Sequence, residues 1–490
     1  MKKMFKNKSA NLIAVYGIFV FLGLLFYFLV LNPLSVYDVD DWLYIYELRK
    51  PIPMIHAWNP TRVFPETFMP IVSYFGVLVI NPLIENYYYS LSAAHGLFAS
   101  ILFTLYFVMF VLLFYKRKLA SAKRSVVYGA VFVFLHFFSH IYRGHDNPSV
   151  LYSINLTCFY FYTLSAIINA SLVMYLMSYD GLKKWFVRSS LLNKLIVVIW
   201  MYFALNSNLY SSVVLATYIG TDFFINLMKD CKTKKFNLRT YLTENKLNLV
   251  VIVWWFAVNL IEVMGGRAGS IHGNLMANLP QTILFGIASL VVKNICILTF
   301  EIVILLKWHK MHAKKLNINA QKFLMYIGFQ MLYLILLSAY VEKSYIIKSE
   351  VILCSFFYIF LAEILCLNSL IKVNEKNKRL PLILLGALAF LLIHPGRMII
   401  PYNFSGIPYN QCEALFNDVL EQFKEAQEKG DNELVVELPK FDSDDNWPLC
   451  DFIGERYSEA LYRHKVIDSY IKVSDVVFSE EKSREFITGQ

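Results

Sequence analysis

The chain has 490 residues, of which 57% are hydrophobic and only 17% are charged, and its mean hydropathy is +0.49. Because soluble domains carry about 25% charged residues, this composition excludes a large soluble protein and indicates a polytopic membrane protein. The net charge of +10 is unevenly distributed, since the last 90 residues hold 19 of the 36 acidic residues. The basic excess elsewhere lies in short loops, without a nucleic-acid-binding motif, and therefore indicates membrane topology.

Eleven apolar segments are predicted to span the membrane, since about 20 apolar residues cross a hydrocarbon core of about 30 Å. They lie near residues 11–33, 90–115, 126–141, 157–178, 194–206, 209–228, 247–264, 288–306, 323–340, 350–371 and 380–400. The first segment is too long and too aromatic for a cleaved signal peptide, so we interpret it as an anchor. Within the loop 34–89, the short segment 69–84 is bounded by Pro70 and Pro82 and predicts an interfacial or re-entrant helix.

The distribution of lysine and arginine predicts the orientation. The N-terminus and the loops 116–124, 179–194, 229–246, 307–322 and 372–379 carry roughly 28 basic residues, whereas the alternate loops carry about 7. We therefore expect a cytoplasmic N-terminus and, with an odd number of spans, an extracytoplasmic C-terminus. The chain then divides into a transmembrane domain, 1–400, and a small extracytoplasmic α/β module, 401–490.

The C-terminal module is predicted to contain a helix at 409–428, a strand at 433–438 and a second helix at 453–464. It is too small to be an independent enzyme, and we expect it to pack on the outer surface of the membrane domain. Cys412 and Cys450 could form a disulfide in an oxidising compartment, or remain two buried thiols.

Acidic and basic side chains recur in the first outer loop. Asp38, Asp40 and Asp41 follow the first span, and Arg49, Lys50, His56, Asn59, Arg62 and Glu66 come after them. One carboxylate could act as a general base, with Arg62 binding a phosphate. Alternatively, the acids form an ordinary helix N-cap. Asp38 and Asp40 also form a D-x-D pair that could hold a divalent cation; we expect no metal, because arginine and lysine can neutralise the same charge.

Three further outer loops offer candidate binding residues. Arg143 and His145 lie in a Gly-Asn-Pro-containing loop, Arg267 follows Glu262 and two glycines, and Lys343 and Lys348 flank a short segment. The residues of each loop could bind phosphate. Alternatively, the first loop is an ordinary polar turn, Arg267 is a snorkelling cation, and the two lysines contact lipid head groups. Lys293, Glu301 and Glu363 are functional candidates because charge is costly inside a membrane. We interpret His95 and His136 as packing residues.

Together these features resemble the GT-C superfamily of membrane glycosyltransferases, and most closely the bacterial serotype-converting glucosyltransferases that modify O-antigen. The resemblance rests on the many spans, the interfacial helix, the outer C-terminal module, the acidic pair Asp40-Asp41 and the element Asn59-Pro60-Thr61-Arg62. It implies location in the bacterial inner membrane and transfer of a sugar from a polyprenyl-phosphate donor to a lipid-linked glycan of the lipopolysaccharide pathway; by analogy with this group, the sugar is expected to be glucose. It also implies a donor-lipid synthase and a flippase as functional partners. We expect no nucleic acid as a partner.

The resemblance also implies the roles of the site residues. Asp40 would be the base of an inverting displacement, and Asp41 would assist or position the acceptor, although Asp38 leaves the identity of the base open. Arg62, Arg143 and Arg267 would neutralise the leaving phosphate. A transporter or flippase of a lipid-linked sugar, and a polysaccharide polymerase or ligase, are the alternatives. A transporter predicts paired charges near the midplane and repeated halves, and a polymerase predicts a large outer loop in the middle of the chain; neither pattern is present in the sequence.

Overall fold

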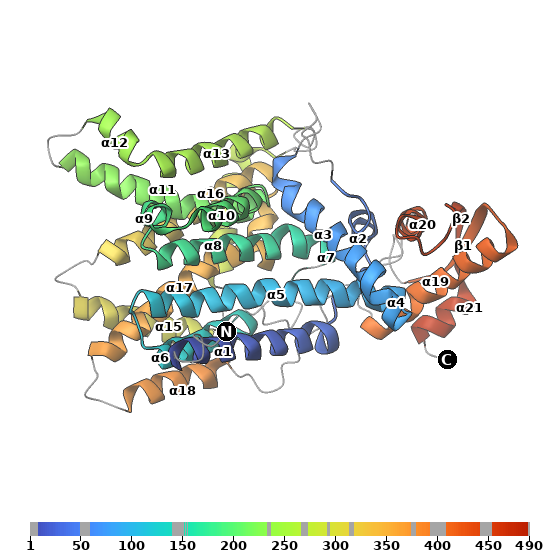
Figure 1. Cartoon of the computed structure of the whole chain (residues 1–490), viewed down its shortest axis with the longest axis horizontal. Helices are drawn as coiled ribbons and strands as arrows, with labels where there is room; N and C mark the ends of the chain where they lie inside the picture. The colour runs from blue at the N-terminus through green and yellow to red at the C-terminus, as the bar shows by residue number, and fades with distance from the viewer. Residues whose placement is uncertain are drawn as a thin grey trace.

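The structure is a computed structural model that describes residues 8–49, 59–139, 151, 153, 155–232, 237–265, 273–291, 295–312, 318–373, 379–392, 408–441 and 453–488. These residues are mostly helical. Long helices lie side by side, and a small unit from the end of the chain sits at one end of them (Figure 1). We call this end, where α2 (Val39–Tyr44), α3 (Val63–Phe75) and the C-terminal residues meet, the site end of the bundle.

Eight helical runs among the described residues are long and apolar enough to cross a membrane, which agrees with a polytopic membrane protein. They are Lys8–Leu31 (α1, Lys8–Phe26, with η2, Tyr27–Leu31), Pro60–Ile84 (η3, Pro60–Arg62; α3; η4, Gly76–Ile80; α4, Asn81–Ile84), Tyr87–Lys116 (α5), Leu156–Ser178 (α7, Leu156–Cys158; η5, Phe159–Leu164; α8, Ser165–Ser178), Leu209–Lys232 (α11), Lys246–Val263 (α13), Lys322–Val341 (within α16, Ile318–Val341) and Glu350–Lys372 (within α17, Ser349–Val373). Seven of them match predicted spans.

The other four predicted spans overlap helices that are shorter or less apolar. These are α6 (Ala122–Phe138), α10 (Leu191–Leu205), α15 (Ile295–His312) and α18 (Leu380–Leu392). The count of eleven spans therefore stays a prediction. Short helices α9 (Leu182–Arg188) and α12 (Leu238–Glu244) join longer ones at the end opposite the site end (Figure 1).

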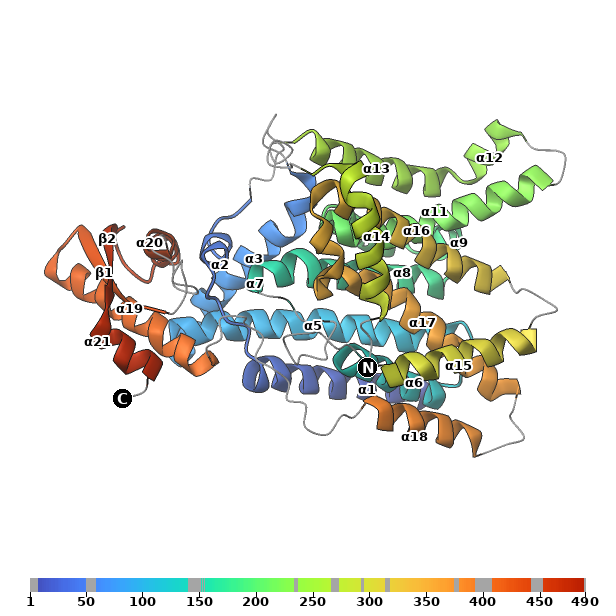
Figure 2. The same ribbon diagram turned by 180° about the vertical axis from the view of Figure 1, so that it is seen from behind.

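The bounds predicted for the eighth span, 288–306, are wrong. Residues Leu275–Val291 form a separate helix, α14, and α15 begins at Ile295. This stretch was left outside the predicted spans, and the apolar run 288–306 joined the end of one helix to the start of the next; Pro280 lies inside α14. α14 crosses the direction of the long helices (Figure 2) and packs on the end of α16, where Asn278 Nδ2 donates to the carbonyl of Ala339 at 3.1 Å.

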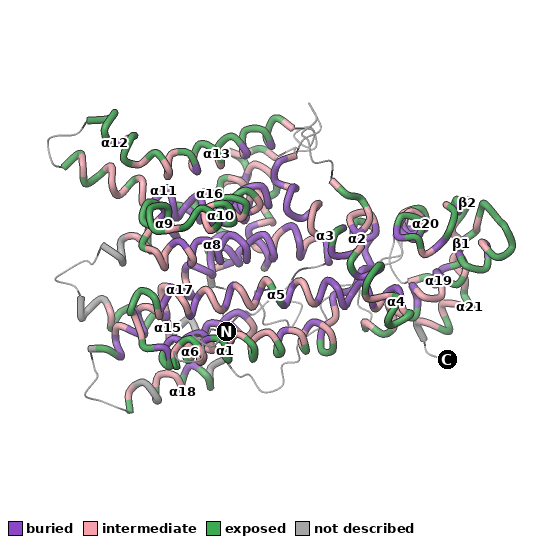
Figure 3. The backbone as a smooth tube through the Cα atoms, viewed as in Figure 1, coloured by how far each residue is buried: buried purple, intermediate pink, exposed green. Residues whose placement is uncertain are grey.

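The core of the bundle surrounds α5 and α8, whose residues are largely buried (Figure 3). Small residues allow this close packing, which drives helix association in lipid. A Cβ on Gly96 of α5 would lie 3.0 Å from the carbonyl oxygen of Phe28, so only glycine lets η2 approach α5 there. His95 and His136 are fully buried and hydrogen-bonded, to Tyr160 and Tyr106 respectively, as predicted for packing residues.

The segment from α3 to α4 runs across the ends of the long helices at the site end (Figure 1). This is the orientation that an interfacial helix would have. A Cβ on Gly76, where η4 begins, would lie 2.8 Å from the carbonyl oxygen of Ser90 in α5, so the segment is packed tightly on that helix.

The C-terminal unit, residues 408–441 and 453–488, contains the three elements expected from the sequence and one that was missed. α19 (Tyr409–Lys429), β1 (Glu433–Pro439) and α20 (Ile453–Arg463) match the predicted helix, strand and helix. β2 (Lys472–Ser479) pairs with β1 in parallel, from Glu433 opposite Lys472 to Pro439 opposite Ser479, and is followed by α21 (Glu480–Ser483) and η8 (Arg484–Thr488). β2 was missed because no residue in it is buried, so its sequence lacks a clear apolar alternation.

This unit docks on the first outer loop through buried aromatic rings. The indole of Trp42 in α2 is fully buried, with ring centroids 5.0 Å from Phe416 of α19 and 4.5 Å from Tyr457 of α20. His464 is also buried, and its Nδ1 lies 2.8 Å from the hydroxyl of Tyr87 at the start of α5. The C-terminal unit and the first loop thus share one core.

Candidate functional site

The acidic cluster after the first span forms the start of α2. Asp38 is the N-cap: its Oδ1 accepts from the backbone N–H of Asp40 at 3.0 Å, and Asp41 Oδ2 accepts from the backbone N–H of Asp38 at 3.3 Å. Carboxylates at these two positions satisfy backbone N–H groups that the helix leaves without partners. The N-cap interpretation, left open from the sequence, is therefore confirmed for two of the three acids.

The same two acids fasten α2 to the start of the fourth candidate span. Asp41 Oδ1 accepts from both the backbone N–H and the hydroxyl of Thr157, at 2.7 and 2.6 Å. Asp38 Oδ2 accepts from Asn155 Nδ2 at 2.7 Å. Asp41 is fully buried, and burial together with the neighbouring Asp38 carboxylate raises the pKa of Asp41 to about 7. Through these bonds Asp41 joins the start of α2 to the start of α7.

Asp40 differs from its two neighbours because its side chain is exposed. It lies four residues before Tyr44, so both side chains stand on one face of α2. The Tyr44 ring is within electrostatic reach of Asp40, Arg62 and Glu66, and burial raises the pKa of its hydroxyl. Of the three acids, Asp40 alone is exposed, since Asp38 and Asp41 are buried.

Arg62 stands beside this face of α2. Its Nη2 donates to the Tyr44 hydroxyl, and its guanidinium carbon lies 5.1 Å from the centre of the Tyr44 ring and 5.0 Å from that of Phe161. Phe161 belongs to η5, a π-helical turn that begins two residues after Thr157. Such turns are frequent at functional sites, and here the turn brings an aromatic ring to the arginine.

Glu66 is shared by two arginines. Arg62 Nε lies 2.9 Å from Glu66 Oε1, and Arg49 Nη1 is paired with Glu66 Oε2. Arg49 Nη2 also donates to the carbonyl of Asn59 at 2.8 Å. We call Arg49, Arg62 and Glu66 the arginine–glutamate triad.

Part of the glycine-containing loop also reaches this site. Glu262, at the end of α13, is buried, and its Oε2 accepts from the backbone N–H of Thr61 at 3.3 Å. A Cβ on Gly265 would lie 3.2 Å from Asn59 Oδ1. The structure thus brings the end of α13 against the Asn59–Arg62 element, 201 residues away along the chain from Thr61.

Lys343 and Lys348 belong to the turn around η7 (Lys343–Ile347), which packs on α14 and α17. Lys348 Nζ lies 4.3 Å from the centre of the Tyr345 ring, which stacks on Tyr210. Lys343 is half-buried.

Several predicted site residues lie outside the described residues: Arg143, His145, Arg267, Lys50, His56 and Cys450, together with Lys293. Cys412 is buried in α19, and its predicted disulfide with Cys450 stays a prediction. Glu301 is buried and Glu363 half-buried in α15 and α17.

The D-x-D pair is poorly arranged for a metal ion. Both oxygens of Asp38 already accept N–H bonds, from Asp40 and Asn155, which leaves Asp40 as the open carboxylate. Among the described residues, no group of three or more His, Cys, Asp or Glu side chains is placed to hold a metal ion.

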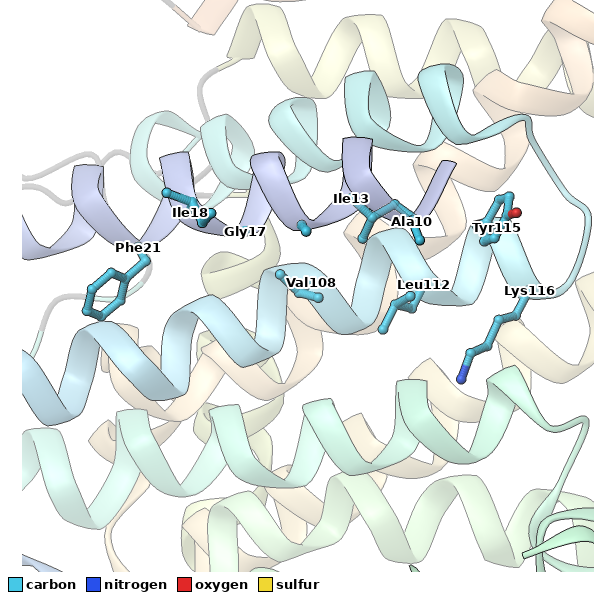
Figure 4. A pocket seen from close by; sticks show the side chains of 10 residues that line it. Ala10, Ile13, Gly17, Ile18, Phe21, Val108, Leu112, Tyr115 and Lys116 are labelled. Atoms are coloured by element: carbon cyan, nitrogen blue, oxygen red, sulfur yellow. The ribbon is translucent and has the colours of Figure 1, made fainter. Parts of the chain in front are cut away.

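An apolar hollow of about 530 Å³ lies between α1 and α5 (Figure 4). Its lining includes Gly17, Val108 and Leu112, and Lys116 marks one end of it. These residues belong to the start of α1 and the end of α5, so the hollow lies away from the acidic turn, which follows the end of α1.

Sequence reasoning missed Tyr44, Asn155, Thr157 and Phe161. Asn155 precedes an apolar run and caps α7, accepting from the backbone N–H of Cys158, a signal that the sequence does contain. Its bond to Asp38 spans 117 residues and has no local signal.

Comparison of the chain with known proteins finds no matching family model, curated protein or solved structure.

Proposed function

We propose that the protein is a membrane glycosyltransferase that moves a sugar from a polyprenyl-phosphate donor to a hydroxyl of an envelope glycan. The observation that carries the proposal is the exposed Asp40 carboxylate, set on one face of α2 with Tyr44, next to Arg62 and its paired charges. A base and an anion-binding group are the two parts that this reaction needs. Both lie where helices long enough to cross a membrane meet the interfacial segment, a place that a lipid-linked donor and a water-soluble acceptor can both reach.

In the proposed reaction, Asp40 takes the proton of the acceptor hydroxyl as its oxygen forms a bond to the anomeric carbon. The bond from that carbon to the phosphate oxygen breaks, its electron pair stays on the phosphate, and polyprenyl phosphate leaves. The configuration of the sugar inverts in this single displacement. Arginine side chains stabilise the charge that develops on the leaving phosphate. Asp38 and Asp41 hold α2 so that Asp40 keeps its place.

The positive-inside pattern supports an extracytoplasmic site end, a cytoplasmic N-terminus and eleven spans. This topology supports a lipid-linked donor, because nucleotide sugars are not supplied outside the cytoplasmic membrane. In this scheme the C-terminal unit lies outside the inner membrane of a bacterium, and an O-antigen precursor is the proposed acceptor, by the resemblance to serotype-converting enzymes.

The test is sugar transfer by purified wild-type protein and Asp40→Asn in lipid nanodiscs, with polyprenyl-phosphate hexoses and purified acceptor glycans. Removal of a general base lowers rates by about 10²–10⁴-fold, so Asp40→Asn is expected to lose transfer while its unfolding midpoint and donor binding stay at the wild-type values. Glu47→Gln is the matched control, since Glu47 is an exposed acid three residues after Tyr44.

Full transfer by Asp40→Asn would remove Asp40 as the base. If the wild-type protein transfers none of these sugars but moves the lipid-linked sugar across the membrane of vesicles, a transporter replaces the proposal.

A further inference from the structure

Two guanidinium groups converge on one carboxylate beside Asp40. Arg49, Arg62 and Glu66 have side chains that are only 11%, 18% and 13% exposed, so their charges are weakly screened by solvent. Two positive charges and one negative charge leave this triad with a net charge of +1. A partly buried site with a single excess positive charge attracts anions.

Arg62 has capacity to bind a further oxygen. Its Nε lies 2.9 Å from Glu66 Oε1 but, among the described residues, this buried N–H has no acceptor in hydrogen-bond geometry. The rings of Tyr44 and Phe161 hold the guanidinium group, which keeps its donors in a fixed direction. Buried donors without an acceptor are rare in native proteins and call for an explanation at each site.

We infer that the arginine–glutamate triad binds the phosphate of the lipid-linked donor, with Arg49 as a second phosphate-binding arginine and Glu66 as the positioning residue. The inference rests on the proposed function. Arginine suits the task because its planar group offers paired donors to phosphate oxygens. Glu66 fixes the spacing of the two groups and lowers their joint charge from +2 to +1, which matches the single negative charge of a phosphodiester.

This charge match has a consequence for product release. When the sugar leaves, the phosphodiester becomes a phosphomonoester, which carries about −1.5 to −2 charges at pH 7. A triad of +1 holds this product less strongly than a pair of arginines at +2 would. Glu66 therefore keeps the spent carrier from remaining on the enzyme.

Lys348 is the main competing candidate for phosphate binding. Its ammonium group stands over the Tyr345 ring. It also interacts electrostatically with Glu350, which lies two residues further along the chain. Because the Arg62 guanidinium contacts Tyr44 on the same helix face as Asp40, we place the phosphate at the triad.

The experiment measures binding of a polyprenyl monophosphate to full-length protein in nanodiscs, with inorganic phosphate as a second probe that lacks the lipid. Arg49→Gln and Arg62→Gln are each expected to weaken binding about ten- to hundredfold, as loss of a charge-assisted hydrogen bond would. Glu66→Gln is expected to bind polyprenyl monophosphate about five- to tenfold more tightly, because the triad then carries +2. Glu66→Asp, which keeps the charge, is expected to stay near wild type, and Lys348→Gln serves as the comparison.

In the transfer assay, Glu66→Gln is expected to lower both KM for the donor and kcat, because the product leaves slowly. If Glu66 were purely structural, Glu66→Gln would bind polyprenyl monophosphate as the wild type does or more weakly. This outcome would overturn the inference. Loss of binding in Lys348→Gln, with the arginine variants unaffected, would also overturn it. The two proposals fail separately. If binding follows the charges of the triad but no sugar is transferred, only the transferase proposal is refuted. If transfer depends on Asp40 but all triad variants bind as the wild type does, only the role of the triad is refuted.

Discussion

The bond between Thr157 and Asp41 gives a stability prediction with a pH signature. Thr157→Val keeps the shape of the side chain but removes the hydroxyl that donates to Asp41 Oδ1 at 2.6 Å. A hydrogen bond to a charged group contributes about 1.5–3 kcal/mol, and one to a neutral group about 0.5–1.5 kcal/mol. The variant should therefore lose more stability when Asp41 is ionised than when it is protonated.

The direction of this pH dependence follows from the raised pKa of Asp41, which is about 7 against an ordinary value of 3.8. A carboxyl whose pKa is raised by folding stabilises the folded state fully below pH 3.8, and this contribution is lost as the pH rises through 7. Thr157→Val removes a donor to the ionised form, so it raises this pKa further and extends the loss of stability to higher pH. We expect a destabilisation of about 2–3 kcal/mol at pH 8 and about 1 kcal/mol at pH 5.

The assay is denaturant unfolding in one detergent at both pH values. Thr104→Val is the matched control, because the Thr104 hydroxyl donates at 2.6 Å to the neutral carbonyl of Ser100 and its loss should not depend on pH. Equal destabilisation of Thr157→Val at pH 5 and pH 8, or none at either, would refute the assignment of Asp41 as a buried anchor.

Two further predictions concern the docking of the C-terminal unit. Trp42→Ala removes a fully buried indole from contact with Phe416 and Tyr457 and should cost about 3–5 kcal/mol; limited proteolysis should then release the C-terminal unit, and protection equal to wild type would contradict the shared core. Burial lowers the pKa of His464 to about 4, so its neutral form is favoured by folding, and stability should fall as the pH drops from 6.5 towards 4. His464→Phe, which loses the contacts to Tyr87 and the Ile45 carbonyl, should be cleaved more readily at pH 7 and should lose this pH dependence; an unchanged pH profile would count against it.

The long helices could be predicted because membrane spans need one continuous property, an apolar run of sufficient length. The same reasoning failed at 275–291, which was left outside the predicted spans although it forms α14, with Pro280 inside the helix. In the C-terminal unit, α19 has a buried stripe at helical spacing and was predictable, whereas β2 has no buried residue and was not. Local pattern thus predicts elements with one well-defined apolar face.

The site could be predicted only where its contacts are local. Arg62 and Glu66 are four residues apart on one helix, a spacing at which opposite charges pair. Arg49 joins the same carboxylate from 17 residues away, and Glu262 reaches Thr61 from the end of α13. Such contacts depend on how the helices pack, which no short motif encodes.

The spacing of the three acids in the sequence nevertheless indicates their different roles. An N-cap residue and the residue three positions later form a reciprocal pair, and Asp38 and Asp41 have this spacing. Capping turns their carboxylates back towards the start of α2, where Thr157 and Asn155 then bury them. Asp40 lies between them at a position that capping does not use, and on a helix this position shares a face with Tyr44. An acidic cluster of this spacing therefore separates into two anchors and one free carboxylate, which is why Asp40, and not Asp41, is the acid on which the proposed chemistry depends.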